Sequence, residues 1–93
     1  MTRTIWKFPI RLEDAINIFM PIGAEVIAVD VQQGEVCIWA VVDPAAPHEC
    51  RTFRCAGTGH SLPDGLGRAQ HIGTVQLDGG ALVFHLFDFD SDS

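Results

Sequence analysis

Apolar residues recur in short runs along the chain, and two pairs of these runs are each joined by a glycine-containing turn. The turns read QQGE and DGG, and the runs on either side of them are rich in β-branched residues. Such runs around a glycine turn predict β-hairpins, because glycine readily takes the positive φ angles that tight turns need. We therefore expect one hairpin from residues 25–31 and 36–42, and a second from residues 72–77 and 81–87.

Three further segments have the composition of strands. Residues 50–56, CRTFRCA, alternate in polarity, and residues 4–10, TIWKFPI, suit an edge strand because Pro9 cannot donate a hydrogen bond to a neighbour. Residues 15–21, AINIFMP, fit either a strand or one turn of helix. Together these patterns predict an all-β fold: a small antiparallel sandwich or barrel-like sheet of about six strands, built from two hairpins and with little helix.

The length of the chain fits one domain. A chain of 93 residues buries roughly two-thirds of the surface that its unfolded form exposes, which is enough for one core. No internal repeat or linker divides the sequence. We expect residues 1–87 to form a single compact β domain and residues 88–93, DFDSDS, to form an acidic flexible tail.

Both faces of the expected central strands are apolar. In ALVFHLF, alternation places Phe84 on one face and Phe87 on the other, and VCIWAVV, which contains Trp39, is apolar on both faces as well. A monomeric antiparallel sheet often leaves one face polar. We therefore expect a homo-oligomer, a dimer or tetramer, with Trp39 and either Phe84 or Phe87 at the interface. A closed two-sheet sandwich in which these side chains are ordinary core is the alternative.

Charge and composition narrow the expected partners. The formal net charge is −6 and the six basic residues form no dense run, so duplex nucleic acid is not expected to bind. A small anion is compatible, because screening at physiological salt acts over about 8 Å and local arginines then outweigh distant carboxylates. No apolar run approaches the ~20 residues of a membrane span, so a soluble protein is expected. An odd number of cysteines, without C-x-x-C spacing or a signal peptide, indicates the cytoplasm.

The segment RTFRCAGTGH, residues 51–60, carries the leading candidate site. Arg51 and Arg54 lie three residues apart, so on a regular strand their side chains point to opposite faces. Arg54 is the nearer to a loop whose glycines allow close backbone approach and expose amides to phosphate oxygens. The expected anion site therefore consists of Arg54 with the loop residues Gly57, Thr58, Gly59 and His60, and a plain turn is the alternative.

Two further features are weaker candidates for chemistry. Trp6 and Lys7 are adjacent on the expected edge strand, where an indole face and an ammonium group suit a nucleobase and its phosphate. His60 has the side chain of a general base, but the sequence has no G-x-S-x-G motif and no pair of carboxylates stands out near this histidine. We therefore expect a binding protein and not an enzyme.

Metal and cofactor sites are not expected. The run His48, Glu49, Cys50 offers metal-ligand types, but adjacent residues of a strand or loop diverge and no second ligand pair follows at zinc-finger spacing. Neither a P-loop nor a dinucleotide-binding glycine motif is present. His71 and His85 lie in apolar strands, where a hydrogen-bonded core or interface histidine is the expected interpretation.

The stretches TIWKF, MPIGAEV, CIWAVVDP, RTFRCAGTGH and IGTVQLDGGALVFHLF together resemble a widespread group of small proteins encoded by phages and prophages, whose function is unassigned. The resemblance extends over residues 4–87, and RTFR-x-x-GTGH is its most specific part. This group is similar to a family of phage anti-CBASS proteins. Members of that family are oligomeric sponges that bind the cyclic nucleotide signals of bacterial immunity without cleaving them.

The resemblance implies immune evasion in the cytoplasm of a bacterial host, an oligomeric assembly, and a cyclic dinucleotide such as cyclic GMP-AMP as ligand. The positions that match its motifs are Arg54, Gly57, Thr58, Gly59, His60, Trp6 and Lys7. Two other functions remain open: a module that binds a host or phage protein through apolar strand faces, and a small hydrolase that uses His60 as base.

Overall fold

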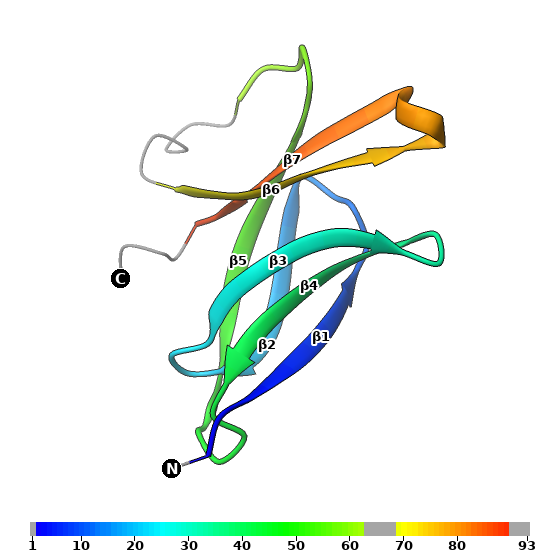
Figure 1. Cartoon of the computed structure of the whole chain (residues 1–93). Helices are drawn as coiled ribbons and strands as arrows, with labels where there is room; N and C mark the ends of the chain where they lie inside the picture. Colours follow the sequence, from blue (N-terminus) through cyan, green and yellow to red (C-terminus); the bar gives the residue numbers. More distant parts are fainter. Residues whose placement is uncertain (1, 63–68, 90–93) are drawn as a thin grey trace.

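The computed structural model describes residues 2–62 and 69–89 and consists almost entirely of antiparallel strands (Figure 1). One short 3-10 turn, η2 at Asp78–Gly80, connects the last two strands. The strands are β1 (Thr4–Ile10), β2 (Ala15–Pro21), β3 (Glu25–Gln32), β4 (Glu35–Val42), β5 (His48–Gly57), β6 (Gln70–Leu77) and β7 (Leu82–Asp88).

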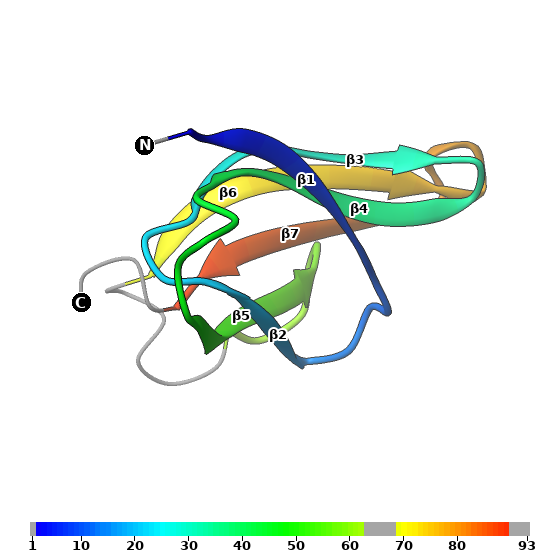
Figure 2. The ribbon, with the colours of Figure 1, turned by 90° about the horizontal axis from the view of Figure 1, so that it is seen from below.

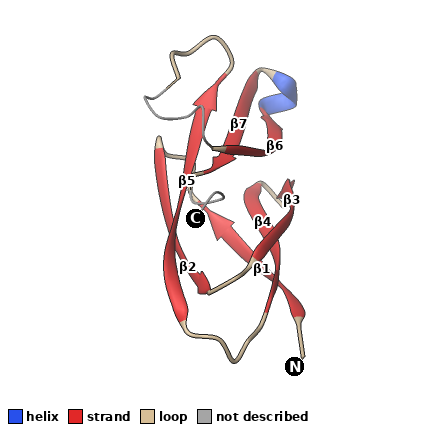
Figure 3. Cartoon of the chain, turned by 90° about the vertical axis from the view of Figure 1, so that its left-hand side faces the viewer, coloured by secondary structure: helices blue, strands red, loops and turns tan. Residues whose placement is uncertain are grey.

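The strands form two sheets that pack face to face. One sheet has the order β1-β4-β3 and the other the order β2-β5-β7-β6, and every pairing is antiparallel (Figure 3). The predicted all-β sandwich is therefore confirmed, with seven strands in place of about six. The segment left open between strand and helix is the strand β2, which pairs with β5.

Both predicted hairpins are present, and the first shows why its turn needs glycine. Gln33 and Gly34 connect β3 to β4 with φ angles of 51° and 82°. Two consecutive positive φ values are the mark of the type I′ turn, whose twist matches that of a hairpin. In the second hairpin, Gly79 and Gly80 have φ angles of 67° and 96° within the connection between β6 and β7.

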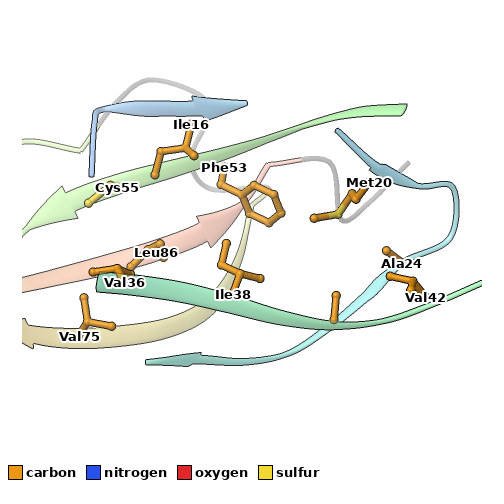
Figure 4. Packing of buried hydrophobic residues seen from close by; sticks show 11 residues of the cluster. Ile16, Met20, Ala24, Val36, Ile38, Val42, Phe53, Cys55, Val75 and Leu86 are labelled. Atoms are coloured by element: carbon orange, nitrogen blue, oxygen red, sulfur yellow. The ribbon is translucent and has the colours of Figure 1, made fainter. Parts of the chain in front are cut away.

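The hydrophobic core lies between the two sheets. Alternate residues of β4 point into it, and the fully buried Ile38 faces Phe53 of β5 and Leu86 of β7 from the opposite sheet (Figure 4). Burying one such side chain contributes roughly 1.5–3 kcal/mol. These contacts fix which side of each strand is left for the outer faces. The buried cluster consists of Ile16, Met20, Ala24, Val36, Ile38, Ala40, Val42, Phe53, Cys55, Val75 and Leu86.

The sandwich is nearly closed along one side, where β3 of the first sheet lies beside β6 of the second (Figure 2). Each of these strands has a register shift, between Val26 and Ala28 in β3 and between His71 and Gly73 in β6. Bulges of this kind bend a strand and strengthen its twist. The two edges can therefore curve toward one another.

Of the three aromatic residues considered for an oligomer interface, one lies in the core and two lie on the surface. Phe84 packs against the core cluster, which agrees with the alternative in which it is an ordinary core residue of the sandwich. Trp39 and Phe87 alternate with buried neighbours and lie half-buried on the outer faces of the two different sheets. The homo-oligomer itself stays a prediction.

The end of β7 extends past the boundary predicted at Phe87. Asp88 belongs to the strand and is 5% exposed. Phe89 donates its backbone N–H to the carbonyl of Thr52 at 3.0 Å. The remainder of the predicted acidic tail, residues 90–93, lies outside the described residues. No helix among residues 2–62 and 69–89 is long and apolar enough to cross a membrane.

Candidate functional site

Arg51 and Arg54 lie on opposite faces of β5, as their spacing predicted. Arg51 points inward, is 8% exposed, and pairs with Asp88 at 2.6 Å between Nη2 and Oδ2. Its Nη1 also donates to the carbonyl of Ala24 at 2.9 Å. Arg54 lies on the outer side, with its guanidinium carbon 5.2 Å from the centroid of the Phe89 ring. Arg51 is therefore held inside the sandwich by its partners, whereas Arg54 lies on the outer face of the sheet.

The loop after β5 is a tight turn with a histidine folded back onto it. The backbone N–H of His60 donates to the carbonyl of Gly57 at 3.0 Å, and Gly59 has a φ angle of 88°. The His60 ring covers Gly57 so closely that a Cβ there would lie 2.8 Å from Nδ1. The positive φ angle favours glycine at position 59, and a side chain at position 57 would have to displace the His60 ring.

A hollow of about 450 Å³ lies between this loop, β5 and the connection from β1 to β2. Arg54, Gly57 and His60 line it, but so do the carboxylates of Glu13 and Asp14. Burial, and secondarily the charge of Asp14, raise the pKa of the Cys55 thiol at the same place above its usual 9.0. Negative charge from two residues makes the hollow itself poorly suited to a polyanion.

A chain of hydrogen bonds joins the loop to the outer face of the four-stranded sheet. Thr58 Oγ1 lies 2.7 Å from His85 Nε2. The other nitrogen of this ring, Nδ1, lies 3.0 Å from Thr74 Oγ1, which in turn lies 3.0 Å from His71 Nε2. We call these four residues the relay. It connects the end of β5 to β7 and β6 through side chains alone.

The relay histidines were interpreted from the sequence as core or interface residues. Their hydrogen bonding agrees with that interpretation, but His71 is exposed and neither ring belongs to the core cluster. The signal that could have placed them is the alternation around the buried Leu86, which puts His85 outward. The pairing of Thr74 with His85 follows from the hairpin register.

Aromatic rings flank Arg54 on the same outer face. Phe87 of β7 is the register partner of Arg54 on β5 and of His71 on β6. Its ring meets the His71 ring edge-on, with centroids 5.4 Å apart. Phe89 lies against the guanidinium group of Arg54, as given above. A cation against one aromatic ring, with a second ring on the neighbouring strand, suits a ligand carrying both negative charge and flat rings.

This outer face carries no carboxylate among the described strand residues that alternate onto it. Register and burial place Asn17 and Thr52 on it as well, 3.0 Å apart between Oδ1 and Oγ1. Arg54 supplies the positive charge of this face, while the carboxylates of Glu13 and Asp14 line the hollow next to it. We define the ligand face as Ala15, Asn17, Phe19, Cys50, Thr52, Arg54, Ala56, Thr58, His71, Thr74, Gln76, Val83, His85, Phe87 and Phe89.

Trp6 and Lys7 are not brought to this site. They lie on β1 in the three-stranded sheet and point to opposite sides of it. Trp6 packs against the core cluster, 6.4 Å from the ring of Phe8. Lys7 is exposed and donates from Nζ to Gln32 Oε1 at 2.9 Å. Within the part of the chain that the structure describes, no group of three or more histidine, cysteine or acidic residues could hold a metal ion.

Fold and site together define a small two-sheet β-sandwich domain whose larger sheet carries arginine, histidine, threonine and aromatic side chains on its outer face. The chain belongs to a family described as a domain of unknown function, DUF7352, whose model matches residues 1–92. The resemblance to a family without an assigned function is confirmed to that extent. No curated protein and no solved structure in the comparisons matches the chain.

Proposed function

We propose that this protein binds and sequesters a small anionic nucleotide without cleaving it. The ligand class is a cyclic dinucleotide such as cyclic GMP-AMP, and the setting is the evasion of anti-phage signalling in a bacterial cytoplasm. The observation that carries the proposal is the ligand face, where Arg54 lies against the ring of Phe89 and is the register partner of Phe87 on the neighbouring strand. The family resemblance described from the sequence supplies the ligand class.

The chemistry of the face matches the parts of such a ligand. Charge-assisted hydrogen bonds from Arg54 to a phosphate stabilise a complex by about 1.5–3 kcal/mol each. A base stacked on an aromatic side chain contributes about 1–3 kcal/mol. Association costs an estimated 4–15 kcal/mol, so one open sheet face binds weakly unless a second protomer covers the ligand. The proposal therefore includes a ligand held between two copies of the chain.

Binding and recovery of the nucleotide test this function. The protein is mixed with cyclic GMP-AMP, free nucleotide is removed by ultrafiltration, and the protein is then heat-denatured. We expect the free nucleotide to fall during incubation and to return intact on denaturation, as measured by liquid chromatography and mass spectrometry. Linear or hydrolysed product would contradict sequestration and support the hydrolase.

Two matched arginine variants locate the binding. Arg54→Gln removes the charge from the ligand face, and we expect its dissociation constant to rise at least tenfold in calorimetry. Arg3→Gln removes a charge from a surface pair with Glu25, 3.2 Å apart, at the start of β1. The Arg3 variant should bind as the wild type does. Equal effects of the two changes would mean that only net charge matters.

Binding to a protein partner is the second candidate, and a specific surface favours it. Ile5 and Ile27 of the three-stranded sheet are 55% and 54% exposed, and Trp39 lies half-buried on the same sheet. Exposed apolar side chains on one sheet are typical of protein contact surfaces. A thermal-shift panel of nucleotides that leaves the melting temperature unchanged would favour this candidate over the nucleotide.

A further inference from the structure

The relay has one hydrogen more than its internal bonds use. With both imidazoles neutral, His71 and His85 carry one N–H each, and Thr58 and Thr74 carry one O–H each. Three internal contacts join the four groups, and each contact uses one hydrogen. A single donor is therefore left. It appears at one end of the chain, on Thr58 or on His71, or in the middle on Thr74, whose oxygen can accept from both rings.

Three arrangements of hydrogens satisfy every contact, and two of them place the spare hydrogen at an end of the chain. In the first, His71 Nε2 donates to Thr74, Thr74 donates to His85 Nδ1, and His85 Nε2 donates to Thr58, whose own hydrogen is then free. In the second, all three bonds reverse. Thr58 donates to His85 Nε2, His85 Nδ1 donates to Thr74, and Thr74 donates to His71 Nε2, so that His71 carries its hydrogen on Nδ1.

The tautomers of the two histidines are consequently coupled in one direction. The first arrangement has the hydrogen on Nε2 of both rings, and the second has it on Nδ1 of both rings. The third has it on Nε2 of His71 and Nδ1 of His85, so that Thr74 accepts from both rings and its own hydrogen points to solvent. The opposite mixed pair gives Thr74 two acceptors and one hydrogen, and it loses a hydrogen bond. A hydrogen on Nδ1 of His71 therefore requires one on Nδ1 of His85, and Thr74, which contacts both rings, enforces this.

The position of His71 on the ligand face decides which end meets the ligand. Arg54, Phe87 and His71 are register partners across β5, β7 and β6. The arginine and the histidine therefore flank one aromatic ring, two strand spacings or roughly 10 Å apart. Thr58 lies four residues further along β5 from Arg54, whose guanidinium group leans toward Phe89. A phosphate-bearing ring placed over Phe87 would therefore reach His71 before Thr58.

We infer that His71 is a ligand-contacting residue, whose Nδ1–H donates to an oxygen of the bound anion. When the relay reverses from the first arrangement to the second, Nδ1 of His71 takes this hydrogen from water and Thr58 releases one to water. This inference rests on the proposed function. A phosphate oxygen accepts hydrogen bonds and donates none, so its arrival at His71 selects the arrangement with the hydrogen on Nδ1 of both rings. His85 thereby acts as a positioning residue. Its tautomer changes although it does not itself touch the ligand.

Nitrogen NMR of the histidine side chains tests the inference directly. The ¹⁵N-histidine-labelled protein is observed at about pH 8.5, where imidazole is neutral, with and without cyclic GMP-AMP. In the free protein, we expect no state with the hydrogen on Nδ1 of His71 and on Nε2 of His85. On binding, both should carry the hydrogen on Nδ1. Nucleotide bound with both rings on Nε2, or with unlike tautomers, would overturn the role of His71.

Variants at Thr74 separate the relay from the fold. Thr74→Val removes the hydroxyl at an exposed strand position that favours β-branched residues. The two tautomers should then become independent, and the dissociation constant for cyclic GMP-AMP should rise about three- to tenfold. Thr74→Ser keeps the hydroxyl and should behave as the wild type, as should Thr4→Val on β1.

The outcomes distinguish this inference from the function on which it rests. If cyclic GMP-AMP binds while His71 keeps its hydrogen on Nε2 and Thr74→Val binds normally, His71 has no part in recognition but sequestration stands. If cyclic GMP-AMP does not bind the wild type, both the proposed function and the assignment of His71 are wrong.

Discussion

Arg51 and Arg54 differ in role because the alternation of β5 sends them to opposite sides of one sheet. Arg51 contributes to a buried pair with Asp88, whose side chain is 7% exposed, while its own side chain is 10% exposed. A buried pair of charges stabilises a fold only slightly relative to apolar residues, but loss of one partner leaves the other charge uncompensated. The sequence indicated that the two arginines diverge. It could not identify the partner of Arg51, which is 37 residues away.

At the residue scale, we predict that Asp88→Asn destabilises the protein by about 3–5 kcal/mol, because the buried charge of Arg51 then has no opposite charge beside it. Urea denaturation followed by circular dichroism measures the change. Arg51→Met combined with Asp88→Leu should recover most of the loss. The surface pair of Arg3 with Glu25 serves as control: Glu25→Ala should cost less than about 1 kcal/mol. An Asp88→Asn variant as stable as this control would show that the pair is solvated.

The local sequence pattern was enough to predict the strands and hairpins, but it could not predict which strands distant in sequence pair with one another. The runs around Gly34 and Gly79 identified four strands, because hairpin partners are neighbours in the chain. The pairings of β1 with β4 and of β2 with β5 join distant segments, and many arrangements of such segments bury the same apolar residues. The ligand face depends on these long-range pairings. For that reason Arg54 and the GTGH loop were found from the sequence, but His71, Phe87 and Phe89 were not.

At the element scale, Gly73 sets how closely β6 can approach β3. A Cβ at this position would lie 2.8 Å from Cβ of Val29. We predict that Gly73→Ala destabilises the protein by about 1–3 kcal/mol, because the two strands must move apart. A double-mutant cycle with Val29→Ala checks the cause by urea denaturation. The cost of Gly73→Ala should fall by more than half in the Val29→Ala background, and an unchanged cost would place the strain elsewhere.

On the scale of the whole molecule, the two outer faces differ in chemistry. The face of the four-stranded sheet is polar and aromatic around Arg54, while the three-stranded sheet exposes Ile5 and Ile27 beside Trp39. Apolar side chains in this arrangement suit contact with a second copy of the chain. The expected oligomer of the free protein can thus form through the three-stranded sheet, while the ligand face stays open to the further copy that covers the bound nucleotide.

We accordingly predict that the protein is at least dimeric and that Trp39→Lys yields monomers, because a buried ammonium group opposes association. Size-exclusion chromatography with light scattering measures the mass. Phe19→Lys changes a side chain that is 70% exposed on the other sheet and should leave the mass unchanged. A wild-type protein that runs as a monomer at about 100 μM would refute the prediction, and dissociation by Phe19→Lys alone would move the interface to the ligand face.

The position of Asp88 and Phe89 has a practical consequence for anyone who shortens or tags the chain. The composition of DFDSDS suggests a dispensable end, yet its first residue neutralises a buried arginine and its second lies against Arg54. Removal of both residues would remove the carboxylate that pairs with the buried Arg51 and the aromatic ring that lies against Arg54. Any trimmed or tagged version should therefore keep the native sequence through Phe89.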